Sequence, residues 1–250
     1  MTKKLIKKLV DIKKKKSGRD SRGHVSVRHQ GGQHKRFVRI IDTHRDKKEI
    51  EAKVISIEYD PNRGANIALV CYLDGEKRYI LAPAKLKKDG IIIASENAPI
   101  EPGNALPLSQ VPVGVPIHNL EILPGKGGQM VRGAGNQAFV QGRSGDQISV
   151  KLPSGEIRLF LANCWATIGQ LSNVAHGSRK LSKAGDKRHR GVRPTVRGVA
   201  QHPDSHPHGG GEGRSPVGMK SPKTPWGKRV GRRTRKKNKH SNSLIVKRRK

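Results

Sequence analysis

The stretch IALVCYLDGEKRYIL, residues 67–81, decides the fold of this 250-residue chain. Its first part, Ile67 to Tyr72, is apolar on both alternating sets of side chains, and its last part is the apolar run Tyr79 to Leu81. Between them, Asp74-Gly75 can adopt the positive φ angles that a two-residue hairpin turn requires. The pattern predicts two antiparallel strands joined by a tight turn.

The sequence on the N-terminal side of this hairpin predicts a further strand and a short helix. Residues Ile50 to Tyr59 have the composition of a strand and end at a turn sequence. The apolar alternation slips at Val54-Ile55, which indicates a β-bulge or burial on both faces. Nearer the start, Leu5, Leu9 and Ile12 have the spacing of a short basic helix.

A second group of strands follows the Pro-rich stretch Pro99 to Pro116. Apolar residues alternate from Ile148 to Leu152, Pro153-Ser154-Gly155 forms a turn, and alternation resumes from Ile157 to Leu161. The chain contains 29 glycines and 15 prolines, a composition that disfavours long helices. Two small β modules, divided near Pro99 to Pro107, fit this spacing of strands and turns.

Charge is distributed unevenly along the chain. Lys and Arg number 52 against 19 Asp and Glu, which gives a net charge of +33. Residues 1–50 carry +12, residues 51–150 carry no net charge, and residues 151–250 carry +21. Such an excess repels itself unless a polyanion is bound, and nucleic acid is favoured over membrane. We therefore expect a neutral folded middle between two basic arms that become ordered when they neutralise phosphates.

The cysteines and the apolar runs indicate the cellular compartment and argue against a membrane span. Cys71 and Cys164 lie far apart and outside any CxxC spacing, so neither a disulfide framework nor a cysteine zinc site is indicated, and a reducing compartment fits. Apolar runs such as Ile91 to Ala94 are too short to span a membrane, and no membrane partner is expected. Met1 to Val10 lacks the apolar stretch of a secretory signal, which leaves a Lys-rich organellar leader as an alternative.

Three Gly-rich segments combine glycine with basic residues: 28–36, 124–129 and 206–214. None has the GxxxxGK[ST] spacing of a nucleotide-binding P-loop. Glycine beside Arg and Lys lets backbone N–H groups approach phosphates closely. A plain flexible turn is the alternative for any single segment, but three of them in one basic chain favour phosphate binding.

Three histidines, His202, His206 and His208, lie in or beside the last of these segments. The intervening prolines and three consecutive glycines exclude a regular helical presentation, so no metal site is expected. Asp204, Ser205 and His206 supply the residue types of a hydrolytic triad, but neighbours on one loop seldom have triad geometry. Donation from an imidazole to a phosphate or a ribose hydroxyl is the favoured role.

Several segments together resemble one known family. In chain order they are YDPNRGANIAL (59–69), RYILAP (78–83), PGKGGQ (124–129), RGVRPTVRG (190–198), HPHGGGEGR (206–214) and TPWG (224–227). The matches are long and run in the family's order. On these motifs the chain resembles the family of the universal second protein of the large ribosomal subunit, in its bacterial or organellar form.

The resemblance implies an all-β fold, with an OB-fold-like barrel followed by an SH3-like barrel and long basic irregular extensions at both ends. The expected boundaries are residues 1–35 for the N-terminal extension, 36–102 and 103–178 for the two barrels, and 179–250 for the Gly-rich C-terminal extension. It also implies a structural, primary rRNA-binding role near the peptidyl transferase centre, with support for subunit association, tRNA binding and peptide-bond formation by the RNA.

Residue by residue, the motifs carry over a set of expected RNA contacts: Arg28, His34, Lys35, Arg63, Lys126, Arg193, Arg197, His206, His208 and Arg214. In the family, the loop that matches 206–214 approaches the catalytic RNA, and its histidine was once considered a participant in peptide-bond formation. Because that chemistry is performed by RNA, His208 is expected to position nucleotides, and no catalytic residue or bound metal is assigned.

The implied partners are large-subunit rRNA, small-subunit rRNA across the subunit interface, tRNA indirectly, and other ribosomal proteins. The implied location is the ribosome of the bacterial cytoplasm or of an organelle matrix or stroma. No cofactor is expected, and magnesium enters only as an rRNA-associated ion.

The chain departs from the family pattern at three places. Met1 to Lys16 looks like a shortened or replaced extension, and Gln33 stands where a third glycine is common. Trp165 stands where arginine is usual. Our hypothesis for Trp165 is that one phosphate contact is exchanged for stacking on a base.

Two other functions are compatible with part of the sequence. A non-ribosomal RNA-binding or chaperone protein built on an OB barrel would explain the charge and the β modules, but not the ordered motifs. A hydrolase or transferase that uses Asp204, His206 and His208 lacks a complete nucleophile, metal or cofactor constellation. The chain is therefore predicted not to be an enzyme.

Overall fold

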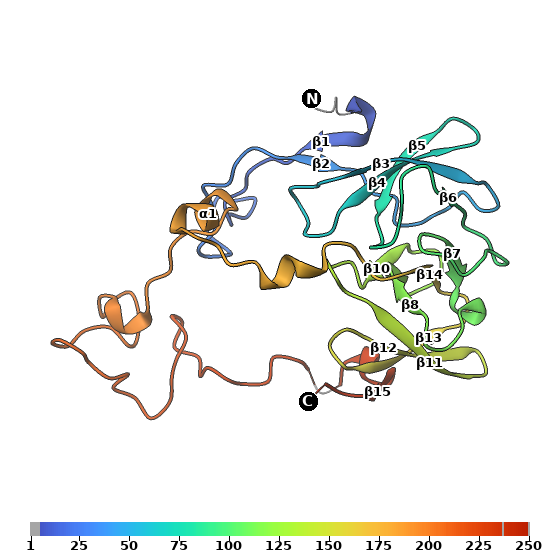
Figure 1. Cartoon of the computed structure of the whole chain (residues 1–250). Coiled ribbons are helices and arrows are strands. Elements are labelled where there is room, and N and C mark those ends of the chain that lie inside the picture. The colour runs from blue at the N-terminus through green and yellow to red at the C-terminus, as the bar shows by residue number, and fades with distance from the viewer. Residues whose placement is uncertain (1–5, 237, 250) are drawn as a thin grey trace. The chain divides into compact units, whose positions relative to one another are not determined.

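The computed structural model describes residues 6–236 and 238–249, which form two compact units (Figure 1). The first, called the barrel unit, contains the described residues of Met1–Lys13, Lys35–Lys180 and Ser241–Lys250. The second, called the basic unit, consists of Lys14–His34 and Leu181–His240. Within the described residues, no helix has the length and apolarity that crossing a membrane requires.

The first half of the barrel unit contains the strands β1 (Val10–Ile12), β2 (Phe37–Arg39), β3 (Ala52–Glu58), β4 (Ile67–Tyr72), β5 (Lys77–Leu81) and β6 (Ile91–Ile92). The last four form one antiparallel sheet in the order β5-β4-β3-β6 (Figure 1). The predicted hairpin is β4–β5, and the pairing of β3 with β4 shifts register between Val54 and Ser56. Both the hairpin and the bulge are confirmed.

The hairpin turn differs in detail from the prediction. The N–H of Tyr72 donates to the carbonyl of Glu76 at 2.9 Å, and the N–H of Gly75 donates to the carbonyl of Tyr72 at 2.9 Å. The loop therefore has three residues, and the positive φ of +82° falls on Gly75. A type I turn followed by one left-handed residue needs a single glycine. Asp74 therefore does not have to adopt the positive φ that a two-residue turn would require of it.

Burial on both faces explains the unbroken apolar run of β4. Ala68 and Val70 belong to one cluster of buried residues. On the opposite face, Ile67 belongs to another cluster, against which Leu9 and Ile41 pack. The neutral middle of the sequence thus forms a core only with the help of residues near its N-terminal side.

The start of the described chain is extended rather than helical. A 3-10 turn at Lys7–Leu9 leads into β1, which pairs antiparallel with β2 from Val10↔Arg39 to Ile12↔Phe37. The prediction of a basic helix is therefore wrong over the described residues, and Leu5 lies outside them. Pairing with a strand distant in sequence outweighs a weak helical pattern that is crowded with lysines.

The second sheet contains β7 (Ala105–Pro107), β8 (Pro116–His118), β11 (Ala138–Ser144), β12 (Gln147–Lys151), β13 (Ile157–Leu161), β14 (Trp165–Ile168) and β15 (Ile245–Lys247). Its order is β15-β13-β12-β11-β8-β14-β7. The two strands predicted around Pro153-Ser154-Gly155 are confirmed as β12 and β13. In β13 the core residue is Phe160, which lies opposite Ile148, whereas Leu161 is 43% exposed.

The remaining elements are short. A small ladder pairs β9 (Leu120–Glu121) with β10 (Gly128–Met130). The 3-10 turns after the first are Leu108–Gln110, Val174–Ser178, Gly198–Ala200 and His240–Asn242, and the α-helix is α1 (Ala184–His189). The Pro-rich stretch contains the strand β7, which ends at Pro107. A proline is compatible with this strand because β7 lies at the edge of its sheet, where a missing N–H is tolerated.

Candidate nucleic-acid interface

Positive charge is concentrated in the basic unit. Its two segments carry 23 Lys and Arg against 4 Asp and Glu, a net charge of +19. The barrel unit, about twice as long, carries 29 against 15, a net charge of +14. Phosphate binding draws on this kind of excess, because each neutralised phosphate releases condensed counterions. The basic unit is therefore the stronger candidate of the two for contacts with nucleic-acid phosphates.

Within the basic unit, part of the Gly-rich segment 28–36 pairs with residues 189–193, although the two are far apart in sequence. The N–H of Arg193 donates to the carbonyl of His29 at 3.0 Å, and the N–H of His34 donates to the carbonyl of His189 at 3.1 Å. The rings of His34 and His189 meet edge to face with centroids 4.4 Å apart. This pairing brings two predicted contacts, exposed His34 and exposed Arg193, into one local structure.

Gln33, where the family commonly has glycine, is accommodated by a glycine on the partner segment. Gly191 has a φ of +98°, and a Cβ added there would lie 3.1 Å from the side chain of Gln33. A side chain on residue 191 would therefore be strained and crowded. Arg28 and Lys35, which flank this region, are both exposed.

Residues 202–214, called the histidine loop, are held in part by their own imidazoles. Nδ1 of His206 accepts the N–H of His208 at 3.1 Å, and Nε2 of His208 accepts the N–H of Lys223 at 2.8 Å. His206 is only 7% exposed and covers Gly198, where an added Cβ would lie 2.6 Å from the ring. Burial, together with electrostatic interactions with His208 and Arg28, lowers the pKa of His206. The two histidines are thus structural parts of the loop.

Two predicted arginines lie around one cavity of the basic unit. Arg197, Gly213 and Arg214 line it together with Val199, Ala200 and Ser215, and its volume is about 470 Å³. Both arginines are exposed. Guanidinium groups beside a glycine backbone are suited to binding a phosphodiester, because Arg offers several N–H donors in a planar fork.

The acidic residue of the loop does not contact His206 as a triad would require. The carboxylate of Asp204 lies 3.1 Å from Nδ1 of exposed His202. Within the part of the chain that the structure describes, no group of three His, Cys, Asp or Glu side chains is arranged to hold a metal ion.

In the barrel unit, the predicted contact Arg63 is tied to a buried carboxylate. Its Nε donates to Oδ2 of Asp60 at 2.8 Å, and Asp60 is fully buried. Asp60 also accepts the N–H of Asn62 at 3.0 Å, which closes the turn after β3. Arg63 therefore stabilises the fold through Nε, while its side chain remains about a quarter exposed.

Lys126 lies on an exposed loop whose backbone N–H groups donate to the carboxylate of Glu121. The carboxylate of Glu121, 3% exposed, accepts the N–H of Gly127 at 2.8 Å, of Gly125 at 3.3 Å and of Trp165 at 3.0 Å. Sequence reasoning missed Glu121. An acid within the apolar stretch 120–123, just before a Gly-rich loop, is the signal that could have identified it.

In the barrel unit, Trp165 and Glu121 line a cavity of about 460 Å³. The ammonium of Lys48 lies 4.6 Å from the centre of the Trp165 ring. The indole is partly buried and already has a cation on one face. A base that stacks on Trp165 would have to use the remaining surface of the ring.

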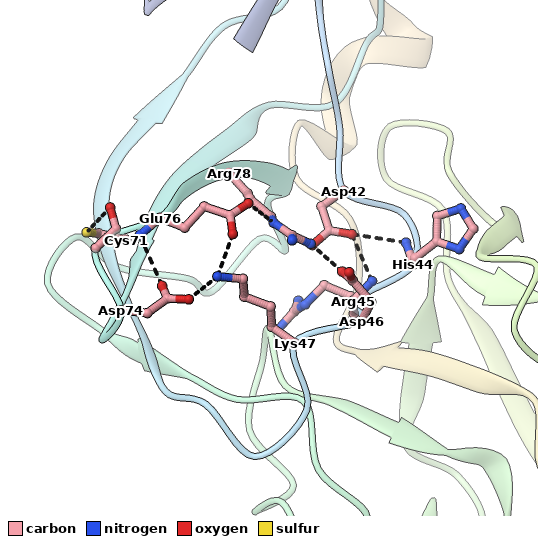
Figure 2. A network of polar contacts seen from close by, with 10 residues as sticks. Asp42, His44, Arg45, Asp46, Lys47, Cys71, Asp74, Glu76 and Arg78 are labelled. Carbon is pink, nitrogen blue, oxygen red and sulfur yellow. Dashed lines mark hydrogen bonds and ion pairs between the residues drawn. The ribbon is translucent and has the colours of Figure 1, made fainter. Parts of the chain in front are cut away.

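Cations near the tip of the β4–β5 hairpin are engaged by acids, as Figure 2 shows. Arg78 donates to Asp42 at 3.1 Å and to Glu76 at 2.7 Å, and Lys47 pairs with Asp74. Arg78 lowers the pKa of Glu76, and Lys47 lowers the pKa of Asp74. The acids Asp42, Asp74 and Glu76 compensate these two cations, which are therefore committed to the fold.

These features define the class of the protein: it is a β protein of two modules that also contains a strongly cationic unit. A family model described as Ribosomal Proteins L2, RNA binding N-terminal domain, matches residues 6–94. A second, described as Ribosomal Proteins L2, C-terminal domain, matches residues 101–227. Together they cover most of the chain, which therefore belongs to the L2 family of ribosomal proteins.

Family membership confirms several expectations at once. The fold is all-β, with an OB-fold-like barrel followed by an SH3-like barrel. The chain is a structural, rRNA-binding constituent of the large ribosomal subunit, where its partners are rRNA and other ribosomal proteins. The expected domain boundaries, individual RNA contacts and lack of a cofactor stay predictions.

Proposed function

We propose that the chain binds large-subunit rRNA near the peptidyl transferase centre, chiefly through the basic unit. The observation that carries this proposal is the gathering of predicted contacts in that unit: Arg28, His34, Arg193, Arg197, His206, His208 and Arg214. Lys35, Arg63 and Lys126 are the proposed contacts of the barrel unit. Arginine and lysine neutralise phosphates, and histidine and glycine N–H groups donate to phosphates or ribose hydroxyls.

From this position the protein would support association with the small subunit and the placement of tRNA. Peptide-bond formation is assigned to the RNA, and the chain is assigned no catalytic residue. The engagement of Nε2 of His208 by a backbone N–H supports a positioning role for that histidine. We propose no protein-bound cofactor, with magnesium as an rRNA-associated ion, and a bacterial or organellar ribosome as the location.

Binding to transcribed large-subunit rRNA over a series of salt concentrations tests the phosphate contacts. The double variant Arg197→Ala/Arg214→Ala should bind more weakly at low salt, and its negative slope of log affinity against log salt should become less steep by about 1 to 2. Lys88→Ala, an exposed lysine of the neutral middle, is the matched control and should leave the slope unchanged. Equal slopes for the double variant and the wild type would contradict the proposal.

Hydroxyl radicals released from an iron chelate test the location. The chelate is attached to Glu212→Cys in a Cys71→Ser background, and the labelled protein is assembled into large subunits. Cleavage should map to nucleotides of the peptidyl transferase centre, whereas a chelate on Glu101→Cys in the barrel unit should cleave elsewhere. Cleavage from position 212 only at distant rRNA would place the loop away from the catalytic RNA.

The non-ribosomal chaperone alternative is separated by sedimentation. A constituent of the subunit should remain with it at high salt, whereas a loosely bound factor should dissociate.

A further inference from the structure

Trp226 lies in the turn of a small hairpin of the basic unit, and 74% of its surface is exposed. The N–H of Thr224 donates to the carbonyl of Lys228 at 2.8 Å, and the N–H of Gly227 donates to the carbonyl of Thr224 at 2.9 Å. Pro225 presets the first turn position, and Gly227 takes a φ of +74°. This is a three-residue turn with the same pattern of hydrogen bonds as the β4–β5 turn.

Contacts on both sides hold the hairpin. The N–H of Val230 donates to the carbonyl of Pro222 at 3.0 Å, and Lys223 pairs antiparallel with Arg229. The N–H of Lys223 also donates to His208 at 2.8 Å, which joins the hairpin to the histidine loop. Trp226 is therefore presented on a backbone that is already ordered, so little conformational entropy remains to be lost when the indole is covered.

The surroundings of the indole indicate what covers it. An exposed tryptophan leaves a large apolar surface in water, and covering that surface is favourable. Four exposed cations follow Trp226 closely in sequence: Lys228, Arg229, Arg232 and Arg233. Trp165 already has Lys48 on its ring, whereas Trp226 is mostly exposed. A flat apolar ring flanked by cations matches an unpaired nucleobase, whose phosphates carry the complementary charge.

We propose that Trp226 is a stacking site for an unpaired nucleobase of the bound RNA, and that Lys228 and Arg229 bind the phosphates beside that base. The inference rests on the proposed function and adds to it a base contact outside the set of residues derived from the motifs. His208 acts on this site as a positioning residue, because it accepts the N–H of Lys223 within the same hairpin.

Tryptophan fluorescence tests the stack directly. In a Trp165→Phe background Trp226 is the only indole, and titration with transcribed large-subunit rRNA should quench its emission. Trp226→Ala in the otherwise wild-type chain should weaken rRNA binding about 5- to 150-fold, the cost of one base stack. The salt slope should not change, because no charge is removed, and Trp226→Phe should recover most of the affinity.

Lys228→Ala is the matched comparison for the charge. It should make the negative salt slope less steep by about 1 and leave the quenching by rRNA in place. Because Trp226 is exposed, the thermal midpoint of Trp226→Ala should equal that of the wild type, so that weaker binding cannot be ascribed to unfolding.

The outcomes separate the two proposals. If wild type and Trp226→Ala bind rRNA equally and the emission of Trp226 is unchanged, the stacking proposal is wrong while rRNA binding stands. If Trp226 is quenched only by other large-subunit proteins, the residue is a protein contact and the stacking proposal is again wrong. If the wild type itself does not bind rRNA, both proposals fail.

Discussion

The backbone N–H of Lys223 donates a hydrogen bond to Nε2 of His208 at 2.8 Å. This bond uses the lone pair that a general base would need, so the neutral imidazole carries its proton on Nδ1. The interaction joins two segments of the basic unit that are fifteen residues apart. In this geometry His208 stabilises structure and is not poised to accept a proton through Nε2.

Substitution of His208 separates positioning from proton transfer. In His208→Gln the amide oxygen can accept the same N–H, so large subunits reconstituted with this variant should form dipeptides within about twofold of the wild-type rate. His208→Ala leaves the N–H without its acceptor, at a cost of about 1 kcal/mol, and should weaken rRNA docking about fivefold. A Gln variant as slow as the Ala variant, with a changed pH profile, would instead assign proton transfer to His208.

Glu121 is expected to determine the stability of the loop that carries Lys126. Glu121→Ala removes one carboxylate from three backbone N–H groups and should lower the free energy of unfolding by about 3 kcal/mol. Glu121→Gln keeps one acceptor oxygen and should cost less. Urea denaturation measures both, with exposed Glu101→Gln as the control within about 0.5 kcal/mol of wild type. A neutral Glu121→Ala would show that the loop does not depend on this anchor.

His118 should make the stability of the barrel unit depend on pH. It is fully buried and donates from Nδ1 to the carbonyl of Gly169 at 2.8 Å. Burial, aided by the charge of Arg45, lowers its pKa from 6.5 to about 4. Between these values the unfolded chain binds a proton that the folded chain does not, so stability falls as pH falls from 6.5 to 4, by about 3 kcal/mol.

A matched variant isolates this titration. His118→Asn keeps a donor near the position of Nδ1 but has no proton to gain, so urea denaturation between pH 7 and pH 4 should show a flatter pH dependence than in the wild type. The comparison concerns the slope, because the smaller side chain also lowers stability at every pH. Identical slopes would mean that another group is responsible for the pH dependence.

Trp165→Arg tests the stacking hypothesis for that position. The substitution places a cation beside Lys48 in place of the cation–π contact and should lower the free energy of unfolding by about 1 kcal/mol. If Trp165 stacks on a base, the wild type should bind rRNA more tightly than Trp165→Arg does at high salt, because a phosphate contact from arginine is screened there. An arginine variant that binds as tightly as the wild type at every salt concentration would remove the hypothesis.

Local patterns in the sequence were sufficient for the strands near the opening motif. The β4–β5 hairpin, the bulge after Val54 and the pair β12–β13 each depend on residues close in sequence. The N-terminal helix failed because its residues pair with Phe37–Arg39, an interaction that a window of helical spacing does not contain. Phe160 was missed as a core residue because both faces of β13 carry apolar side chains.

The candidate site was predictable by residue type but not by arrangement. Motifs named Arg193 and His34, but their proximity depends on pairing between segments more than 150 residues apart. Glu121 and Asp60 were missed because their role is to accept backbone N–H groups from turns, which composition does not reveal. Trp226 stood within a recognised motif, and its exposure could be known only from the folded turn.

The pairing of β13 with β15 has a consequence for the connectivity of the basic unit. The chain leaves the barrel unit after Lys180 and re-enters it at Ser241, and Lys14–His34 likewise runs between the paired strands β1 and β2. Both cationic segments are therefore closed loops, fastened at each end by strand pairing. One proteolytic cut within either loop would leave both fragments attached to the barrels, whereas a free tail would lose everything beyond the cut.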